Sequence, residues 1–209
     1  MIDVKTFPVG YLGTNAYVVT EKDTGETLIV DPGCVDSSLT NYLDSIPSEK
    51  IKFILLTHGH FDHIGGAGEY AKKYKAKIVI SQKDSVFLSD NTLNLSSMFS
   101  RPLEPLKADI TLNEGDVLSL GGTNFYFMHT PGHTQGSGCF IFPDENIIFS
   151  GDTLFYLSMG RTDFPTSNPA QMIESLGRLS DLSGDYTVYP GHDRATTLNT
   201  ERERNPYLR

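Results

Sequence analysis

The chain lacks the features that mark secreted, membrane-spanning or disulfide-rich proteins. It has only two cysteines, Cys34 and Cys139, and they do not form the Cys-x-x-Cys spacing of redox or zinc motifs. We expect both to be ordinary buried thiols in a reducing compartment. The sequence also has no apolar run long enough for a signal-peptide core or a membrane span. A cytoplasmic location is therefore expected.

Positive charge is scarce as well. The 209 residues include 17 Lys and Arg against 26 Asp and Glu, which gives a formal net charge of -9. This balance disfavours a nucleic-acid partner bound through phosphate contacts. We expect neither a nucleic-acid nor a membrane partner, and a monomer or homodimer. With 38% hydrophobic residues, no linker and no low-complexity segment, one domain over residues 1–209 is the simplest expectation.

The hydrophobic pattern predicts strands and helices mixed along the chain. Such a mixture favours an α/β fold in which helices cover two sheets. The predicted strands are residues 3–7, 16–20, 27–30, 51–56, 77–81, 117–120, 124–128, 138–142, 146–149 and 186–189. The predicted helices are residues 37–46, 67–74, 82–89 and 169–179, with a short one near the C-terminus. Residues 91–109 are irregular, and this segment is either a lid or binding loop or a loop whose apolar side chains cover core.

Residues 57–63, Thr-His-Gly-His-Phe-Asp-His, stand between a predicted buried strand and a predicted helix. Residues two apart in extended backbone point the same way, so His58 and His60 can bind one ion together. Asp62 and His63 follow after the chain has turned, so they can face a second point nearby. Imidazole nitrogens and a carboxylate oxygen suit zinc and similar divalent ions. The segment therefore predicts a metal site.

The same arrangement recurs at three other predicted strand ends. Apolar runs lead through Pro-Gly to His133 and His192, and through Ser-Gly to Asp152. The neighbouring glycines allow the backbone and a ligand to approach closely, and bound ligands lie outside strand ends in α/β folds. Any one of these residues alone is often a turn or core residue, so the prediction depends on their conjunction. His129 sits at a strand end without the Pro-Gly and is expected to be structural.

Seven predicted ligands are too many for one tetrahedral ion, which takes four. They suit two divalent ions, most simply Zn²⁺, with Fe or Mn as alternatives. We predict that one carboxylate, Asp152, bridges the two ions and that a shared water or hydroxide completes both shells. The predicted ligands of the first ion are His58, His60 and His133, and those of the second are Asp62, His63 and His192. Such a centre lowers the pKa of the shared water and supplies a nucleophile without a Ser, Cys or Thr.

The motifs together resemble the metallo-β-lactamase superfamily. They are residues 57–63, Thr-Pro-Gly-His-Thr-x-Gly-Ser at 130–137, Gly-Asp-Thr-Leu-Phe at 151–155 and Tyr-Pro-Gly-His at 189–192. Ile-Val-Asp-Pro-Gly at 29–33 is similar to the first motif of this family, in which the aspartate, here Asp31, supports a ligand from behind. The resemblance spans nearly the whole chain and implies an αββα sandwich of two mixed sheets flanked by helices. It also implies metals in a groove at one sheet edge.

Within the superfamily, residues 151–155, Ser-Met-Gly-Arg-Thr-Asp-Phe at 158–164 and Asn-Pro-Tyr-Leu at 205–208 resemble glyoxalase II-like hydroxyacylglutathione hydrolases. The chain is expected to lack the C-terminal helical domain that helps such enzymes to hold glutathione. Arg161 stands where the family has a lysine, and Arg194 stands where it has a tyrosine. The resemblance implies that Arg161 and Tyr156 bind substrate, unless Arg161 forms a salt bridge with a loop acid such as Asp163. It also argues against a true β-lactamase, because those proteins lack the carboxylate at the position of Asp152.

These observations predict a dinuclear hydrolase of small thioesters, of the S-acylglutathione kind. In this reading hydroxide bound by the metals attacks the thioester carbonyl, and Asp62 holds it in line. The alternative is a persulfide dioxygenase, which the run at 161–164 also resembles and which uses one iron bound by two histidines and an aspartate. One iron would not require all seven ligands. A scaffold without activity predicts missing ligands, and none is missing.

Overall fold

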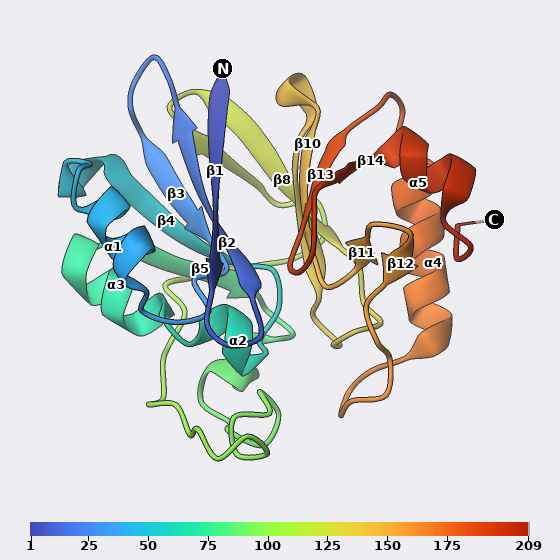
Figure 1. Ribbon diagram of the computed structural model, residues 1–209, viewed down its shortest axis with the longest axis horizontal. Coiled ribbons are helices and arrows are strands. Elements are labelled where there is room, and N and C mark those ends of the chain that lie inside the picture. The colour runs from blue at the N-terminus through green and yellow to red at the C-terminus, as the bar shows by residue number, and fades with distance from the viewer. Residues whose placement is uncertain (209) are drawn as a thin grey trace.

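Two six-stranded sheets pack face to face in the computed structural model, which describes residues 1–208 (Figure 1). The first sheet has the order β1-β2-β3-β4-β5-β6, antiparallel from β1 to β3 and parallel from β3 to β6. Its strands are β1 (Ile2–Val9), β2 (Thr14–Glu21), β3 (Thr27–Val30), β4 (Ile51–Leu56), β5 (Lys77–Ser81) and β6 (Ile110–Leu112).

The second sheet has the order β14-β13-β10-β9-β8-β7, in which only the pair β10 and β13 is parallel. Its strands are β7 (Val117–Leu120), β8 (Thr123–His129), β9 (Gly138–Phe142), β10 (Ile147–Gly151), β13 (Thr187–Pro190) and β14 (Thr196–Thr197). A separate hairpin is formed by β11 (Leu154–Phe155) and β12 (Ser158–Met159). Both large sheets are thus mixed, as predicted.

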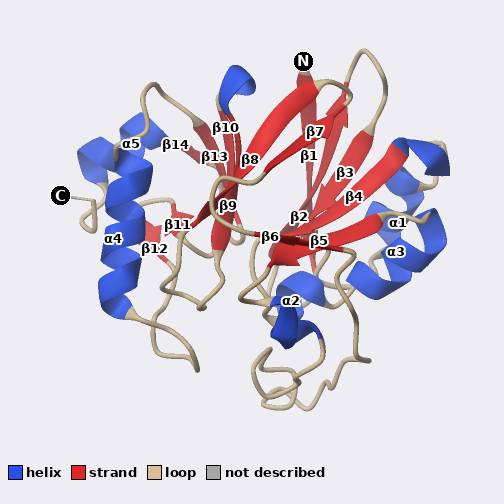
Figure 2. Cartoon of the chain, turned by 180° about the vertical axis from the view of Figure 1, so that it is seen from behind, coloured by secondary structure: helices blue, strands red, loops and turns tan. Residues whose placement is uncertain are grey.

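Helices cover the outer face of each sheet. Figure 1 shows α1 and α3 on one side of the molecule and α4 and α5 on the other, and Figure 2 shows the same layers from behind. The helices are α1 (Ser37–Leu43), α2 (Phe61–Ile64), α3 (Ala67–Tyr74), α4 (Pro169–Ser180) and α5 (Leu198–Arg204), with 3₁₀ turns η1 (Ser48–Lys50), η2 (Ser85–Leu88) and η3 (Pro143–Glu145). The predicted αββα sandwich is confirmed.

Side chains that alternate between the two faces of each strand form three apolar layers, one between the sheets and one under the helices on each side. In β4, Leu55 packs between the two sheets, while Ile54 and Leu56 pack under α1 and α3. Aromatic residues of the second sheet, among them Phe140 and Phe149, fill the middle layer opposite Leu55. Successive strand residues point to opposite faces, so a buried strand with helices outside and a sheet inside is apolar on both.

Two predictions about local structure are wrong. Residues 82–89 do not form a helix but only the turn η2, because polar side chains there bond the local backbone or other loops. Ser85 Oγ donates to the Gln82 carbonyl at 2.8 Å, and Asp84 reaches the loop before α2. Cys139 is buried, but Cys34 is only partly buried and lines a small cavity beside Asp62.

The structure also contains short elements that the pattern did not predict: β6, α2, β11, β12 and β14. Among the described residues, no helix has both the length and the apolar character needed to cross a membrane. Residues 91–109 leave η2 and project beyond the end of the sheets near α2 before the chain enters β6 (Figure 1).

Candidate metal centre

The structure brings all seven predicted ligands together at one end of the sandwich. His58 and His60 follow β4, and Asp62 and His63 lie in the single turn of α2. The other three, His133, Asp152 and His192, follow β8, β10 and β13. These strands are held in register by sheet pairing and by the shared middle layer, so their ends meet although they are far apart in sequence. Ligand roles for these side chains stay predictions.

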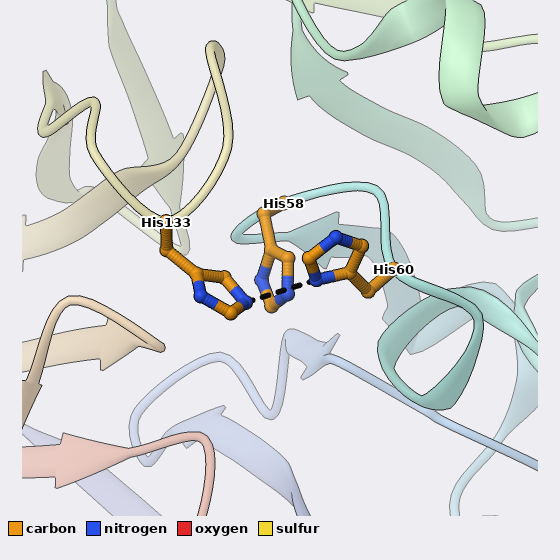
Figure 3. Close-up of side chains that lie close together, drawn as sticks. All are labelled: His58, His60 and His133. Carbon is orange, nitrogen blue, oxygen red and sulfur yellow. Dashed lines mark hydrogen bonds between the residues drawn. The ribbon is translucent and has the colours of Figure 1, made fainter. Parts of the chain in front are cut away.

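Three imidazoles form a first group, which Figure 3 shows with the rings turned toward one another. The ring centroids of His58 and His60 are 4.8 Å apart, and those of His60 and His133 are 4.6 Å apart. His60 Nδ1 lies 2.9 Å from His133 Nε2. All three side chains are buried. One ion can therefore be reached by one nitrogen from each ring.

A carboxylate and two imidazoles form a second group beside the first. Asp62 Oδ2 lies 3.3 Å from His192 Nε2 and 3.6 Å from His63 Nε2. Thr14 Oγ1, at the start of β2, donates to the same Asp62 oxygen at 3.0 Å. Thr14 could not be predicted as part of the site, because its partner lies 48 residues away in the chain.

Asp152 lies between the two groups. Its Oδ2 is 3.5 Å from His133 Nε2 in the first group and 3.7 Å from His192 Nε2 in the second. Its Oδ1 is 3.4 Å from His63 Nε2. Because Oδ2 lies near a histidine of each group, this carboxylate is placed to bridge two ions.

Several atoms of the cluster are buried without a hydrogen-bond partner. They are His58 Nε2, His60 Nε2, His63 Nε2 and Asp152 Oδ1. Buried polar atoms are nearly always paired, and each one left unpaired costs about 1–3 kcal/mol. A cluster of such atoms, all of types that coordinate divalent ions, fits bound metal.

The protonation of the two groups differs. Burial, together with the neighbouring imidazoles, holds the pKa of His58 and that of His60 well below the usual range. Burial also lowers the pKa of His133. These rings are therefore neutral near pH 7, which is the form that binds metal.

Carboxylates dominate the second group. Burial opposes the charged form of His63, but Asp152, Asp62 and Asp31 outweigh it and raise its pKa. Burial likewise opposes the charge on Asp62, yet His63 and His192 lower its pKa well below the usual range. Asp62 therefore stays ionised. The group has the negative potential that attracts cations, and without a metal it attracts protons instead.

Asp31 supports His63 from behind, as the family resemblance implied. Its Oδ2 lies 2.9 Å from His63 Nδ1 and accepts a hydrogen bond from Thr57 Oγ1 at 2.6 Å. Its Oδ1 accepts the Thr57 backbone N–H at 2.8 Å. With Nδ1 donating to a carboxylate, Nε2 is the nitrogen that His63 turns to the cluster, and a metal bound there would displace the proton that the raised pKa of His63 retains. In the same way, His133 Nδ1 lies 2.7 Å from the Arg161 carbonyl and presents Nε2.

A further buried carboxylate, Asp84, ties together two ligand-bearing loops. Its Oδ2 accepts the Gly59 backbone N–H at 3.0 Å and the Thr134 hydroxyl at 2.6 Å. Burial raises its pKa to about 6, against the lowering effect of these hydrogen bonds. The sequence missed Asp84, because nothing near it in the chain indicates that its partners lie 25 and 50 residues away.

The loop that carries His192 is fastened to the first sheet. Asn15 Nδ2 donates to the carbonyls of Pro190 and Asp193, at 3.1 and 2.8 Å. Gly191 leaves no room for a side chain, since a Cβ there would lie 2.2 Å from Asp152 Oδ1 and 2.7 Å from His63 Cε1. The predicted close approach of backbone and ligand at this glycine is confirmed.

A cavity of about 450 Å³ opens above the cluster, with Asp62, His133, Asp152 and His192 in its lining. Arg161 also lines it, but its guanidinium bonds both oxygens of Asp163, at 2.6 and 2.7 Å. The salt bridge considered from the sequence is therefore present in this structure.

The structure does not bring Tyr156 into the cavity lining, where its neighbour Phe155 takes that place. The Tyr156 ring instead lies under the Arg194 guanidinium, at 3.6 Å. The substrate-binding roles of Arg161 and Tyr156 stay predictions. His129 lies outside the cluster, and its Nε2 is 2.9 Å from the Gln135 carbonyl.

Comparison with known proteins places this geometry in context. The chain matches the family model of the metallo-beta-lactamase superfamily over residues 9–192. It is 32% identical over 210 residues to the hydroxyacylglutathione hydrolase GloC of Haemophilus influenzae, a match covering 99% of this chain and 98% of that protein.

Two solved structures are similar over nearly the whole chain. BLEG-1 B3 metallo-beta-lactamase is 33% identical with a TM-score of 0.91, covering 100% of this chain and 99% of that one. TTHA1623, solved in a di-iron-bound form, is 31% identical with a TM-score of 0.85, covering 98% of this chain and 100% of that one.

Proposed function

The chain belongs to the metallo-β-lactamase superfamily, and from that premise we propose that it is a dinuclear metal-dependent hydrolase of small thioesters. The observation that carries the dinuclear part is the position of Asp152, whose Oδ2 lies within 3.7 Å of a histidine in each of the two ligand groups. The relative GloC, a hydroxyacylglutathione hydrolase, supports the thioester as substrate.

In this proposal His58, His60 and His133 would hold one ion, Asp62, His63 and His192 would hold the other, and Asp152 would contribute to both sites. Two divalent ions there, most simply Zn²⁺ with Fe or Mn as alternatives, would lower the pKa of a shared water and polarise the thioester carbonyl. The di-iron form of TTHA1623 supports two ions in a centre of this kind.

The chain's own residues orient the reactants. Asp62 is kept ionised by its histidine neighbours and fixed by Thr14, so it can accept a hydrogen bond from the attacking water and hold it in line. Asp31 and the Arg161 carbonyl fix the tautomers of His63 and His133. The thiolate needs no strong general acid, because its pKa is low compared with that of an amine.

Similarity to BLEG-1 B3 metallo-beta-lactamase over the whole chain favours a second candidate, hydrolysis of β-lactams, and the carboxylate of Asp152 argues against it. The two reactions share attack of water on an acyl carbon. The alternative of a mononuclear iron persulfide dioxygenase would use only one of the two groups. We therefore rank it below both hydrolases.

Metal counting combined with a substrate panel tests the proposal. Purified protein should hold two ions per chain and should hydrolyse simple thioesters faster than β-lactams. Asp152→Ala and His58→Ala should lose metal and turnover together, by more than about a hundredfold in kcat/KM. His129→Ala is the matched control, a histidine at a strand end outside the cluster, and should keep both.

Each alternative has its own signature. Thioester turnover that survives in Asp152→Ala contradicts the mechanism. Hydrolysis confined to β-lactams favours the second candidate, and one iron per chain with oxygen uptake favours the dioxygenase. The cytoplasmic location, the small-molecule substrate and the monomeric or homodimeric state stay predictions from the sequence.

A further inference from the structure

The cavity above the cluster is walled largely by apolar side chains, which come from several segments of the chain. Leu12 comes from the turn between β1 and β2, Leu95 and Phe99 come from residues 91–109, and Phe155 and Met159 come from the β11–β12 hairpin. A volume of about 450 Å³ suits a small ligand, and apolar walls around a few polar groups are typical of binding sites. Residues 91–109 therefore combine both predicted features: Leu103, Leu106 and Ala108 pack against the core under α1 and α3, while Leu95 and Phe99 line this cavity.

Some of the apolar residues at this cavity are exposed. Leu12 and Phe99, both in its lining, are 40% and 39% exposed, and Tyr11, whose ring contacts that of Phe99, is 59% exposed. The centroid of the Phe99 ring lies 4.8 Å from that of Phe61 and 6.4 Å from that of Tyr11. Contiguous exposed apolar groups mark binding surfaces in soluble proteins, and here they adjoin the candidate catalytic groups.

Leu95 is held against the cavity by a strained backbone. It has φ +68°, in the left-handed region that a leucine rarely adopts, yet its side chain is only 3% exposed. The preceding Asn94 is anchored on both sides, since its Nδ2 donates to the Phe87 carbonyl and its own carbonyl accepts the Phe61 N–H. A glycine would adopt this backbone without strain, so the conformation serves to present the leucine side chain.

Within residues 1–208, the cavity lining also offers no free Lys or Arg side chain to an anionic substrate. Among the described residues that line it, Arg161 is the one Lys or Arg, and Asp163 already takes both arms of its guanidinium fork. The same guanidinium lies 4.2 Å over the Phe164 ring. An anionic group on a substrate would have to compete with Asp163, so it gains little at this wall.

We propose that this cavity binds an apolar arm of the substrate, a straight alkyl or aryl group, in preference to an anionic arm. The inference rests on the proposed function and narrows its substrate class. Leu12, Leu95 and Phe99 are then specificity-determining residues. The arm lies on either the acyl or the thiol side of the thioester, and the experiment distinguishes the two.

Two homologous thioester series test this on the metal-loaded protein. One lengthens the acyl chain from acetyl to hexanoyl on a fixed neutral thiol, and the other lengthens an alkyl thiol on a fixed acetyl group. In one series kcat/KM should rise about fourfold per methylene over the first few, since a buried methylene is worth ~0.8 kcal/mol. A glutathione thioester should be hydrolysed no faster than a neutral thioester of the same acyl group.

Variants locate the arm in the cavity. Phe99→Ala should reduce the ratio of long-chain to short-chain kcat/KM by about tenfold, and Phe99→Leu should restore part of it. Ile173→Ala is the matched control, because Ile173 is a large apolar residue, 49% exposed, on α4 and outside the cavity lining. Its ratio should equal that of the wild type.

Calorimetry with acetate, butyrate and hexanoate and with short and longer alkanethiols, which are the product classes, gives a readout that does not require turnover. Affinity that rises with chain length in one class, without thioester hydrolysis, would overturn the proposed function and keep the apolar cavity. Hydrolysis with a flat profile in both series, or a preference for the glutathione thioester that Phe99→Ala leaves unchanged, would overturn the cavity inference alone.

Discussion

Replacing Asp31 by asparagine should selectively weaken the second metal ion. Asp31 is an acceptor for three hydrogen bonds, two from Thr57 and one from His63 Nδ1. Asparagine offers one oxygen and one NH₂ group in the same space. If its oxygen faces the Thr57 backbone N–H, its NH₂ faces His63 Nδ1. That nitrogen must then give up its proton, and Nε2, which faces Asp62 and Asp152, must carry it.

The opposite orientation is no better, because the NH₂ group then meets the Thr57 backbone N–H inside the protein. Either way a buried donor loses its acceptor, at a cost of about 1–3 kcal/mol in folding stability. Loss of a support of this kind lowers metal affinity by about 10–100-fold, or about 1.4–2.8 kcal/mol. On the proposed assignment the loss falls on the ion of His63, whereas the ion of His58, His60 and His133 keeps its affinity.

Competition with a chromophoric chelator measures the two affinities separately, and urea unfolding measures the change in stability. Asp36→Asn is the matched control, since Asp36 caps α1 and asparagine caps a helix equally well. It should leave both affinities unchanged. Equal weakening of both ions by Asp31→Asn, or no weakening of either, would refute the assignment of His63 to a separate ion.

Two further substitutions probe the groups around the centre. Folding raises the pKa of Asp84 from 3.8 to about 6, so the fold favours its protonated form and loses stability as pH rises through this interval. Asparagine cannot ionise. The free energy of unfolding of metal-free Asp84→Asn, measured in urea, should therefore rise relative to that of the metal-free wild type between pH 4.5 and pH 7, by at most about 3 kcal/mol. An identical pH dependence would contradict this. Gly191→Ala places a methyl group 2.2 Å from Asp152 Oδ1 and should lower metal content and activity together. Gly177→Ala in α4, where no atom lies within 4 Å of the added methyl group, should instead leave activity intact and add about 0.5–1 kcal/mol of stability. Loss of activity in both variants would show that crowding at Asp152 does not explain the loss in Gly191→Ala.

Much of the candidate site was predictable, because its signals are local. His58 and His60 share a direction since they are two residues apart in extended backbone, and the structure places them in one group. Glycine beside a liganding residue indicated close approach, and Gly191 shows it. The end of a buried strand can be recognised from an apolar run alone. Once these strands are assumed to form packed sheets, their four ends are expected to meet at one edge.

What the sequence could not show depends on partners distant in the chain. The polarity of residues 82–89 suits an exposed helix, but Asp84 is drawn inward by Gly59 and Thr134. For Arg161 the sequence left a substrate contact and a salt bridge with the nearby Asp163 open, and the fold of the loop shows that the salt bridge is formed. Cys34 was expected to be buried, yet the turn at Gly10 leaves it beside a small cavity.

The cluster also links the centre to folding. Four of its buried atoms, on His58, His60, His63 and Asp152, have no hydrogen-bond partner within the protein. At about 1–3 kcal/mol each, their combined cost is comparable to the about 5–15 kcal/mol that stabilises a whole domain. A sequence selected only for a stable fold would replace them with apolar residues. Their retention is explained if ions bind the folded state and not the unfolded chain, because such binding stabilises the fold in proportion to its affinity. The neutral first group and the carboxylate-rich second group then differ for a reason: the first offers unprotonated nitrogens, and the second offsets the charge that two adjacent dications bring.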